Sequence, residues 1–213
     1  MAAALIGRDI VIERGGRTIL DGVSFVVPAG RALIVTGPNG VGKTSLLRAC
    51  AGLLPLASGS IGLDGGEADR SVGEQAHVIG HADGLKAAMT VRENLAFWSR
   101  FLNTDTGSGQ HDVDPVLRRL LMHSLAEVPC AFLSAGQRRR VALARLLVAQ
   151  RPVWLLDEPT AALDARVSQL FVDIVDEFLG DGGIVVAATH RELALGAYDE
   201  LALTRGTWTG ADA

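Results

Sequence analysis

The stretch that decides the fold reads Gly37-Pro38-Asn39-Gly40-Val41-Gly42-Lys43-Thr44. A glycine, four residues, Gly-Lys and a hydroxyl residue form the pattern of a phosphate-binding P-loop. The apolar run 32–36 precedes it, and residues 45–49 continue as helix-forming sequence. This strand–loop–helix context favours a nucleotide-phosphate site over a glycine-rich turn without a ligand.

The residue types in this loop suit phosphate groups. The glycines let backbone N–H groups turn toward the phosphates, and the following helix start adds positive potential. We expect Lys43, one of two lysines in the chain, to reach the β- and γ-phosphates, and the Thr44 hydroxyl to bind Mg²⁺. The predicted nucleotide-binding residues here are Gly37, Pro38, Asn39, Gly40, Val41, Gly42, Lys43, Thr44 and Ser45.

The composition is that of a globular chain with a substantial core. Of 213 residues, 48% are hydrophobic and 21% charged, with a mean hydropathy of +0.27. The net charge of −4 disfavours a nucleic-acid binder. No apolar run reaches the roughly 18 residues of a membrane span, and the first residues do not resemble a secretory signal. We expect a soluble protein of a reducing compartment, with Cys50 and Cys130 as buried thiols rather than a disulfide.

The apolar patterns outside the loop predict an α/β fold. Residues 9–13 and 22–27 alternate apolar and polar, and Gly15-Gly16 lies between them, which predicts an antiparallel hairpin. By contrast, residues 32–36, 153–156 and 184–188 are continuous apolar runs. Such runs are typical of central strands in a parallel sheet covered on both faces.

The stretch of about 85–148 is predicted to be mainly helical. Residues 91–102 and 138–150 have helical spacing, and the polar segment 103–112 is predicted to be a surface loop. We therefore expect one domain over 1–213. Its α/β core would comprise about 1–84 and 149–213, and the helical subdomain of about 85–148 would be inserted into that core.

Two of the apolar strands end in residues suited to phosphoryl chemistry. Ligands of open parallel sheets sit beyond the carboxyl ends of the strands, so Gly37, Asp157 and His190 should converge. We expect Asp157 to hold Mg²⁺, directly or through water, and Glu158 to polarise the attacking water. His190 could position the γ-phosphate; the alternative is a strand-end histidine with only structural partners.

The segment Leu133-Ser134-Ala135-Gly136-Gln137 opens an arginine-bearing helix. Ser134 is a good N-cap and Gly136 allows close backbone approach, so this helix start can bind an anion. An ordinary helix cap is the alternative. We interpret the run 138–140, three arginines, as a solvated or interface face rather than a nucleic-acid patch.

Together these motifs resemble the ABC-type ATPases over essentially the whole chain. The P-loop, 133–137 (LSAGQ), 153–160 (VWLLDEPT), 162–164 (ALD) and Thr189-His190 occur in the family's order and spacing. The resemblance implies a head-to-tail dimer that holds ATP between one P-loop and the partner's signature segment. Ser134 and Gly136 would then serve the other subunit's nucleotide, and Asp164 would lie in the loop that communicates across the dimer.

Two positions depart from the family pattern. Where most relatives stack an aromatic residue on adenine, this chain has Arg14, whose guanidinium can also stack on a base. Where most carry a glutamine, nine residues before Thr90, it has His81. A neutral imidazole can present a nitrogen lone pair as the glutamine presents its oxygen, so we expect His81 to act in the catalytic region. The alternative is a loop histidine that only packs against the subdomain.

Within the family, residues 79–86 and the signature segment resemble the ATP-binding subunits of haem-exporting cytochrome c maturation complexes. The resemblance implies ATP and Mg²⁺ as cofactors, and hydrolysis that powers haem export or release of a haem-loaded periplasmic chaperone. It implies integral membrane partners (CcmB, with CcmC and CcmD). It also implies a peripheral place on the cytoplasmic face of the bacterial inner membrane.

Other functions remain as alternatives. An ABC exporter of a lipid or a peptide is the main one. A nucleic-acid-handling ABC ATPase is disfavoured, because the chain carries neither a long coiled-coil insertion nor a second cassette. A nucleotide-binding regulatory module without hydrolysis is disfavoured by the joint presence of Lys43, Asp157, Glu158 and His190.

Overall fold

The computed structural model describes residues 4–103, 112–190 and 193–204. The chain forms two compact units, each described here by itself. The first comprises residues 1–80, 152–158 and 172–213, and the second comprises residues 81–151 and 159–171. The whole stretch predicted to be helical, about 85–148, falls within the second unit. Of the surface loop predicted at 103–112, residues 104–111 lie outside the described residues.

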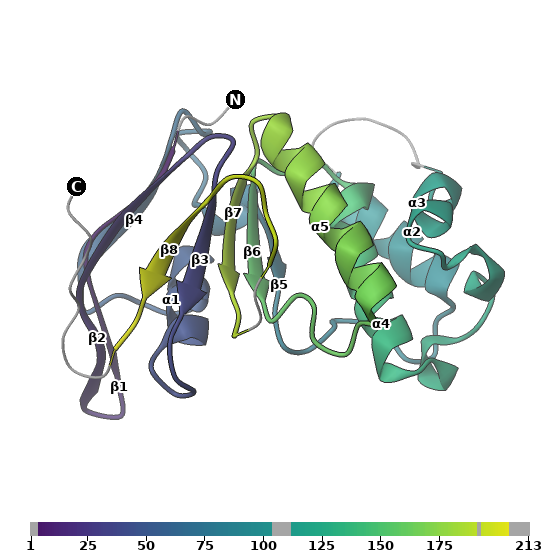
Figure 1. The fold of residues 1–213 in the computed structure, drawn as a ribbon, viewed down its shortest axis with the longest axis horizontal. Coiled ribbons are helices and arrows are strands. Elements are labelled where there is room, and N and C mark those ends of the chain that lie inside the picture. The colour runs from purple at the N-terminus through teal and green to yellow at the C-terminus, as the bar shows by residue number, and fades with distance from the viewer. Residues whose placement is uncertain (1–3, 104–111, 191–192, 205–213) are drawn as a thin grey trace. The chain divides into compact units, whose positions relative to one another are not determined.

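The first unit begins with an antiparallel sheet. Strands β1 (Ala4–Arg14) and β2 (Arg17–Pro28) form the predicted hairpin, with Gly15-Gly16 in its turn. Strand β4 (Ser58–Asp64) pairs with the other edge of β1, which gives the order β2-β1-β4 (Figure 1). The patterns did not predict β4, because its short sequence includes two glycines and most of its residues are exposed.

The second sheet of this unit is parallel and has five strands in the order β5-β6-β7-β3-β8 (Figure 1). The three predicted apolar runs are its central strands, whose residues are nearly all buried. The edge strand β8 went unpredicted because residues 198–200 are polar and exposed. The strands of this sheet are β3 (Ala32–Thr36), β5 (Ala76–Ile79), β6 (Val153–Asp157), β7 (Ile184–Ala188) and β8 (Tyr198–Ala202).

The core of the first unit joins both sheets to helix α1 (Lys43–Cys50). Leu46, Leu47 and Cys50 on α1 are buried with inward residues of both sheets. Cys50 is a free thiol, and burial raises its pKa to about 12. Cys130 is also free and buried, so the prediction that both cysteines are buried thiols is confirmed. The packing of α1 against this core fixes the start of the helix, where the P-loop ends.

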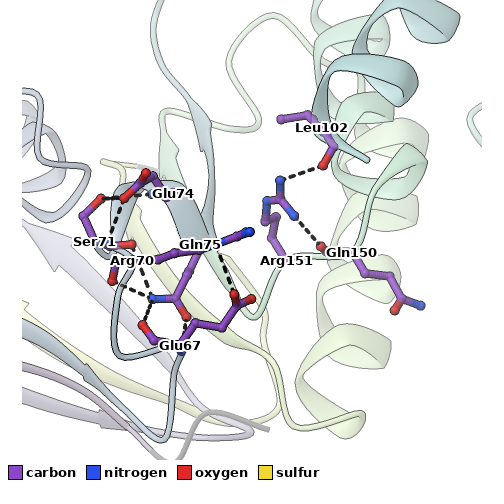
Figure 2. A network of polar contacts seen from close by, with 8 residues as sticks. All are labelled: Glu67, Arg70, Ser71, Glu74, Gln75, Leu102, Gln150 and Arg151. Atoms are coloured by element: carbon purple, nitrogen blue, oxygen red, sulfur yellow. Dashed lines mark hydrogen bonds and ion pairs between the residues drawn. The ribbon is translucent and has the colours of Figure 1, made fainter. Parts of the chain in front are cut away.

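A side-chain network orders the loop before β5. Gln75, at the end of a 3₁₀ turn (Gly73–Gln75), is buried, and Figure 2 shows its contacts with Glu67 and Arg70. Its Oε1 accepts from Glu67 N at 2.6 Å, and its Nε2 donates to Glu67 O at 3.1 Å and Arg70 O at 3.0 Å. One buried amide thus satisfies several backbone groups of the loop. This ordered loop fixes where β5 begins, and β5 ends two residues before His81.

The second unit is built on helices. The prediction of a helix over 91–102 is confirmed by α2, and Thr90 caps it through a capping box with Glu93. Helix α4 begins directly after Ser134, so the prediction that Ser134 caps the arginine-bearing helix is confirmed. The helix ends at Val148, two residues before the end of the predicted stretch 138–150. Helix α5 starts in this unit and ends in the first. The helices are α2 (Val91–Leu102), α3 (Asp114–Arg119), α4 (Ala135–Val148) and α5 (Ala165–Gly180), with 3₁₀ turns at His123–Leu125 and Cys130–Phe132. Over the described residues, no helix combines the length and apolar character needed to cross a bilayer.

Candidate nucleotide-binding and catalytic site

The P-loop connects β3 to α1 with a backbone that glycine permits. Gly37, Gly40 and Gly42 all have left-handed φ values, +131°, +78° and +119°. A Cβ at Gly37 would collide with the carbonyl oxygen of Leu203, and a Cβ at Gly42 would lie 2.7 Å from Leu20 Cδ2. Gly42 is also the N-cap of α1, and no described side chain caps it. The first amides of α1 are therefore available to an anion, which fits phosphate binding.

Lys43 lies over this loop. Its side chain is buried, and Nζ donates to Gly37 O at 2.6 Å and Pro38 O at 3.1 Å. These carbonyls hold the ammonium group inside the curve of the loop. The predicted role of Lys43 in binding phosphate is compatible with this position, because a compact cation with three donors can contact oxygen atoms on several sides.

Thr44 and Asp157 meet across the sheet edge. Thr44 Oγ1 donates to Asp157 Oδ2 at 3.0 Å, although 113 residues separate them. Asp157 is the last residue of β6 and is buried. A hydroxyl and a carboxylate are the hard oxygen donors that Mg²⁺ prefers. Among the described residues, no group of three or more His, Cys, Asp or Glu side chains could hold a metal ion, and a Mg²⁺ bound through one carboxylate, one hydroxyl and phosphate oxygens needs none.

Glu158 turns the chain away from β6. Its φ of +47° is left-handed, and its N–H donates to Ala188 O at 2.8 Å on β7. The carboxylate, only 17% exposed, places Oε1 at 2.8 Å from His190 Nδ1 and accepts a long hydrogen bond, 3.4 Å, from Thr189 Oγ1. The predicted convergence of the strand ends is thus present. Sequence reasoning assigned Thr189 no role, although its place beside His190 was a usable signal.

Arg14 ends β1 at the hairpin turn and is exposed. The same hairpin packs against the P-loop, because Ile19 Cγ2 and Leu20 Cδ2 approach Gly42. An exposed guanidinium near the end of this hairpin lies in the same unit as the P-loop. That placement is compatible with the predicted contact to a base.

The signature segment lies in the second unit. Ser134 caps α4, with Oγ accepting from Gln137 N at 3.2 Å, and Gln137 Oε1 accepts from Ser134 N at 2.8 Å. Gly136 faces Ala162, since a Cβ there would lie 2.7 Å from the Ala162 carbonyl oxygen. Asp164 accepts from Val167 N at 2.9 Å at the start of α5. His81, also in this unit, is exposed.

The interpretation of residues 138–140 as a solvated or interface face was wrong for Arg139, which packs inside its own unit. This side chain is buried, donates from Nε to Pro159 O at 3.2 Å and pairs with Asp83 Oδ1 at 3.5 Å. The cause is helical spacing: position 139 falls on the stripe of α4 that continues through the buried residues 142, 143 and 146. The composition of residues 138–140 suggested a solvent-exposed charged run. The helical period instead places Arg139 on the buried side of α4.

Comparison with known proteins agrees with this architecture. A family model described as ABC transporter matches residues 20–161. Among solved structures, a bacterial Atm1-family ABC exporter with ATP bound gives a TM-score of 0.80 at 24% identity, over 98% of this chain and 38% of that one. An ABC transporter ATP-binding subunit gives 0.77 at 21% identity, over 88% and 80%. These likenesses concern the fold.

Curated relatives are more similar in sequence. The cytochrome c biogenesis ATP-binding export protein CcmA of Rhodopseudomonas palustris (strain BisB5) is 50% identical over 193 residues, 91% of this chain and 94% of that protein. The CcmA proteins of Chelativorans sp. (strain BNC1) and Rhizobium etli are 46% and 42% identical, over 95% and 96% of this chain. The similarity therefore extends over both units.

Proposed function

Because the chain belongs to the ABC transporter family of ATP-binding proteins, we propose that it is the ATP-hydrolysing subunit of a bacterial complex for cytochrome c maturation. The observation that carries this proposal is the near full-length similarity to CcmA proteins. Hydrolysis would power haem export or release of a haem-loaded periplasmic chaperone. The partners would be the integral membrane subunits CcmB, CcmC and CcmD, with this chain peripheral at the cytoplasmic face of the inner membrane.

The side chains of the first unit divide the work of hydrolysis. The P-loop amides and Lys43 bind the phosphates. Glu158 orients a water and receives its proton as the oxygen attacks the γ-phosphorus, while ADP departs with the β-phosphate oxygen. His190 is held at Nδ1 by Glu158, so the opposite ring nitrogen, Nε2, is the atom that would contact the γ-phosphate. Mg²⁺, held by Thr44 and Asp157, would neutralise charge that develops on the phosphates.

The second unit would complete the site of another copy. In a head-to-tail dimer, the start of α4 would present Ser134 and Gly136 to the nucleotide on the partner's P-loop. The amides of a capped helix start suit that anion. Arg14 would stack on the base, and His81 would face the metal and the attacking water.

The proposed function predicts that Lys43→Ala abolishes cytochrome c maturation. Loss of the ammonium should weaken ATP binding by roughly 30-fold or more, the cost of removing one partner of a buried charged contact. The measurement is complementation of a strain lacking its own gene for this subunit, with ATP affinity measured on the purified chain. Full complementation by Lys43→Ala would contradict an ATP-driven role. Failure of the wild-type chain, in a strain that its own gene restores, would instead point to another ABC exporter.

His81 tests the proposed catalytic and coupling role of its loop. We expect His81→Gln to retain coupled activity, because the amide oxygen can replace the imidazole lone pair. His81→Ala should keep ATP binding and lose maturation. ATP affinity, ATPase rate and cytochrome c yield are measured for each variant. If His81→Ala supports maturation as well as wild type does, the side chain has no coupling role.

A further inference from the structure

We propose that Arg139 and Arg145 of α4 act as positioning residues that clamp Asp83 and Gly84, and so hold the segment carrying His81 in register with the signature. We name these four residues the arginine clamp. The inference rests on the proposed function of His81 and Ser134 in ATP hydrolysis. All of these residues lie in the second unit.

Arg139 joins α4 to two segments at once. Its Nη1 lies 3.5 Å from Asp83 Oδ1, two residues after His81, and its Nε donates to Pro159 O at 3.2 Å. The Arg139 side chain is 5% exposed and that of Asp83 is 25% exposed. Arg139 therefore links the signature helix to the segment after β5 and to the residue that follows Glu158.

Arg145 holds the backbone of the same segment. Its Nη1 donates to Asp83 O at 3.2 Å, and its guanidinium carbon lies 3.7 Å from the centre of the Trp98 ring. Burial lowers the pKa of Arg145 to about 10, although the Asp83 carboxylate acts in the opposite direction. Its Nε is buried and has no hydrogen-bond partner among the described residues. Arg145 as a whole is only partly buried, but a buried donor without a partner costs stability. A role beyond stability would account for the presence of this arginine.

A side chain at Gly84 would strain the backbone and crowd the Arg145 guanidinium. The φ of Gly84 is +66°, and a Cβ would lie 2.8 Å from Arg145 Nη1 and 3.8 Å from Trp98 Cζ2. Trp98 Nε1 donates to Gly84 O at 3.3 Å. Both carbonyls of the Asp83-Gly84 pair are thus bonded, one from α4 and the other from α2.

The arginine clamp connects the segment that carries His81 to helix α4, whose N-cap is Ser134 of the signature segment. Arg139 lies five residues after Ser134, or about 7.5 Å along the helix axis. A helix transmits a displacement over that length as a rigid rod. A shift of the His81 segment therefore moves the start of α4, and the reverse also holds. The two groups proposed to meet nucleotide in different subunits are coupled within one unit.

The test compares Asp83→Asn, Arg139→Gln, their double variant and Gly84→Ala in the full-length chain assembled with its membrane partners. We expect kcat for ATP to fall about tenfold, with the ATP dissociation constant of the isolated chain nearly unchanged. The double variant should fall no further than the worse single variant, since Arg139→Gln already removes the ion pair that Asp83→Asn removes. Asp83→Asn changes no side-chain volume, so it remains informative if Gly84→Ala fails to fold.

Two controls match these changes. Asp114→Asn breaks a 2.6 Å ion pair with Arg92 in the same unit, away from the clamp. Gly52→Ala places alanine at a similar left-handed φ, +69°, where a Cβ meets nothing within 4 Å. Both should keep wild-type kcat. The proposal is overturned if the clamp variants also keep wild-type kcat, or if their losses equal those of the controls or simply follow thermal stability. Glu158→Gln is assayed in parallel to separate the two proposals. Hydrolysis by Glu158→Gln would contradict the proposed function. If Glu158→Gln is inactive and the clamp variants are fully active, only the clamp proposal is rejected.

Discussion

Glu158→Gln is expected to bind ATP with wild-type affinity and to lose about 10²–10⁴-fold in hydrolysis rate, the usual contribution of a positioned general base. The amide has the shape of the carboxylate and can still contact His190, whose Nδ1 lies 2.8 Å from Glu158 Oε1. It cannot accept a proton from water. The variant should therefore accumulate as an ATP-bound dimer.

Single-turnover phosphate release and size-exclusion chromatography with ATP measure the two effects. Glu93→Gln is the matched control, because Glu93 sits at the third position of α2, where glutamine also serves in a capping box. The control should hydrolyse ATP as wild type does. Near-wild-type turnover by Glu158→Gln would remove Glu158 from the proposed mechanism.

Ser134→Arg should abolish hydrolysis while the isolated chain retains its ATP affinity. Ser134 is exposed at the start of α4, and a long cation there would block approach of the signature to a partner's nucleotide. In the isolated chain, the phosphates would be bound by the P-loop of the chain's own first unit, and this substitution lies in the second unit. Steady-state ATPase assays and nucleotide titration separate the two effects.

Ser134→Arg also removes a helix cap, which costs about 1 kcal/mol. Thr90→Arg removes the equivalent cap of α2, where the Thr90 hydroxyl accepts from Glu93 N at 3.1 Å. This control should lose similar stability and retain ATPase activity. Full activity of Ser134→Arg would mean that no composite site forms at the signature.

The central strands, α2 and the P-loop were predictable because each has a local signal. Strands β3, β6 and β7 are buried on both faces, so their apolar runs are uninterrupted. Strand β8 gave no such signal because it lies at an edge and gains its pairing from distant β3. Edge strands of this kind are defined by tertiary pairing rather than by local composition.

The candidate site divides in the same way. Asp157 and Glu158 had a local signal because they stand at the end of an apolar strand, and Thr44 had one because it completes the P-loop pattern. Arg139 was misread because three consecutive arginines suggest solvent, and the carboxylate that accompanies this one, Asp83, lies 56 residues earlier. The sequence around Arg139 does not indicate that Asp83 is its partner. A buried charge is explained by its distant contacts, and those depend on the fold.

The strand order determines when the parallel sheet around the P-loop can form during synthesis on the ribosome. Strand β3 leads into the P-loop early in the chain, yet its neighbours are β7 and β8, the last two strands of the described residues. Leu203, whose carbonyl oxygen abuts Gly37 and whose N–H donates to Thr36 O at 3.0 Å, belongs to this late segment. A nascent chain that has exposed only the P-loop lacks both strands that flank it. Nucleotide can therefore begin to act as a folding ligand only when translation of the described chain is nearly complete.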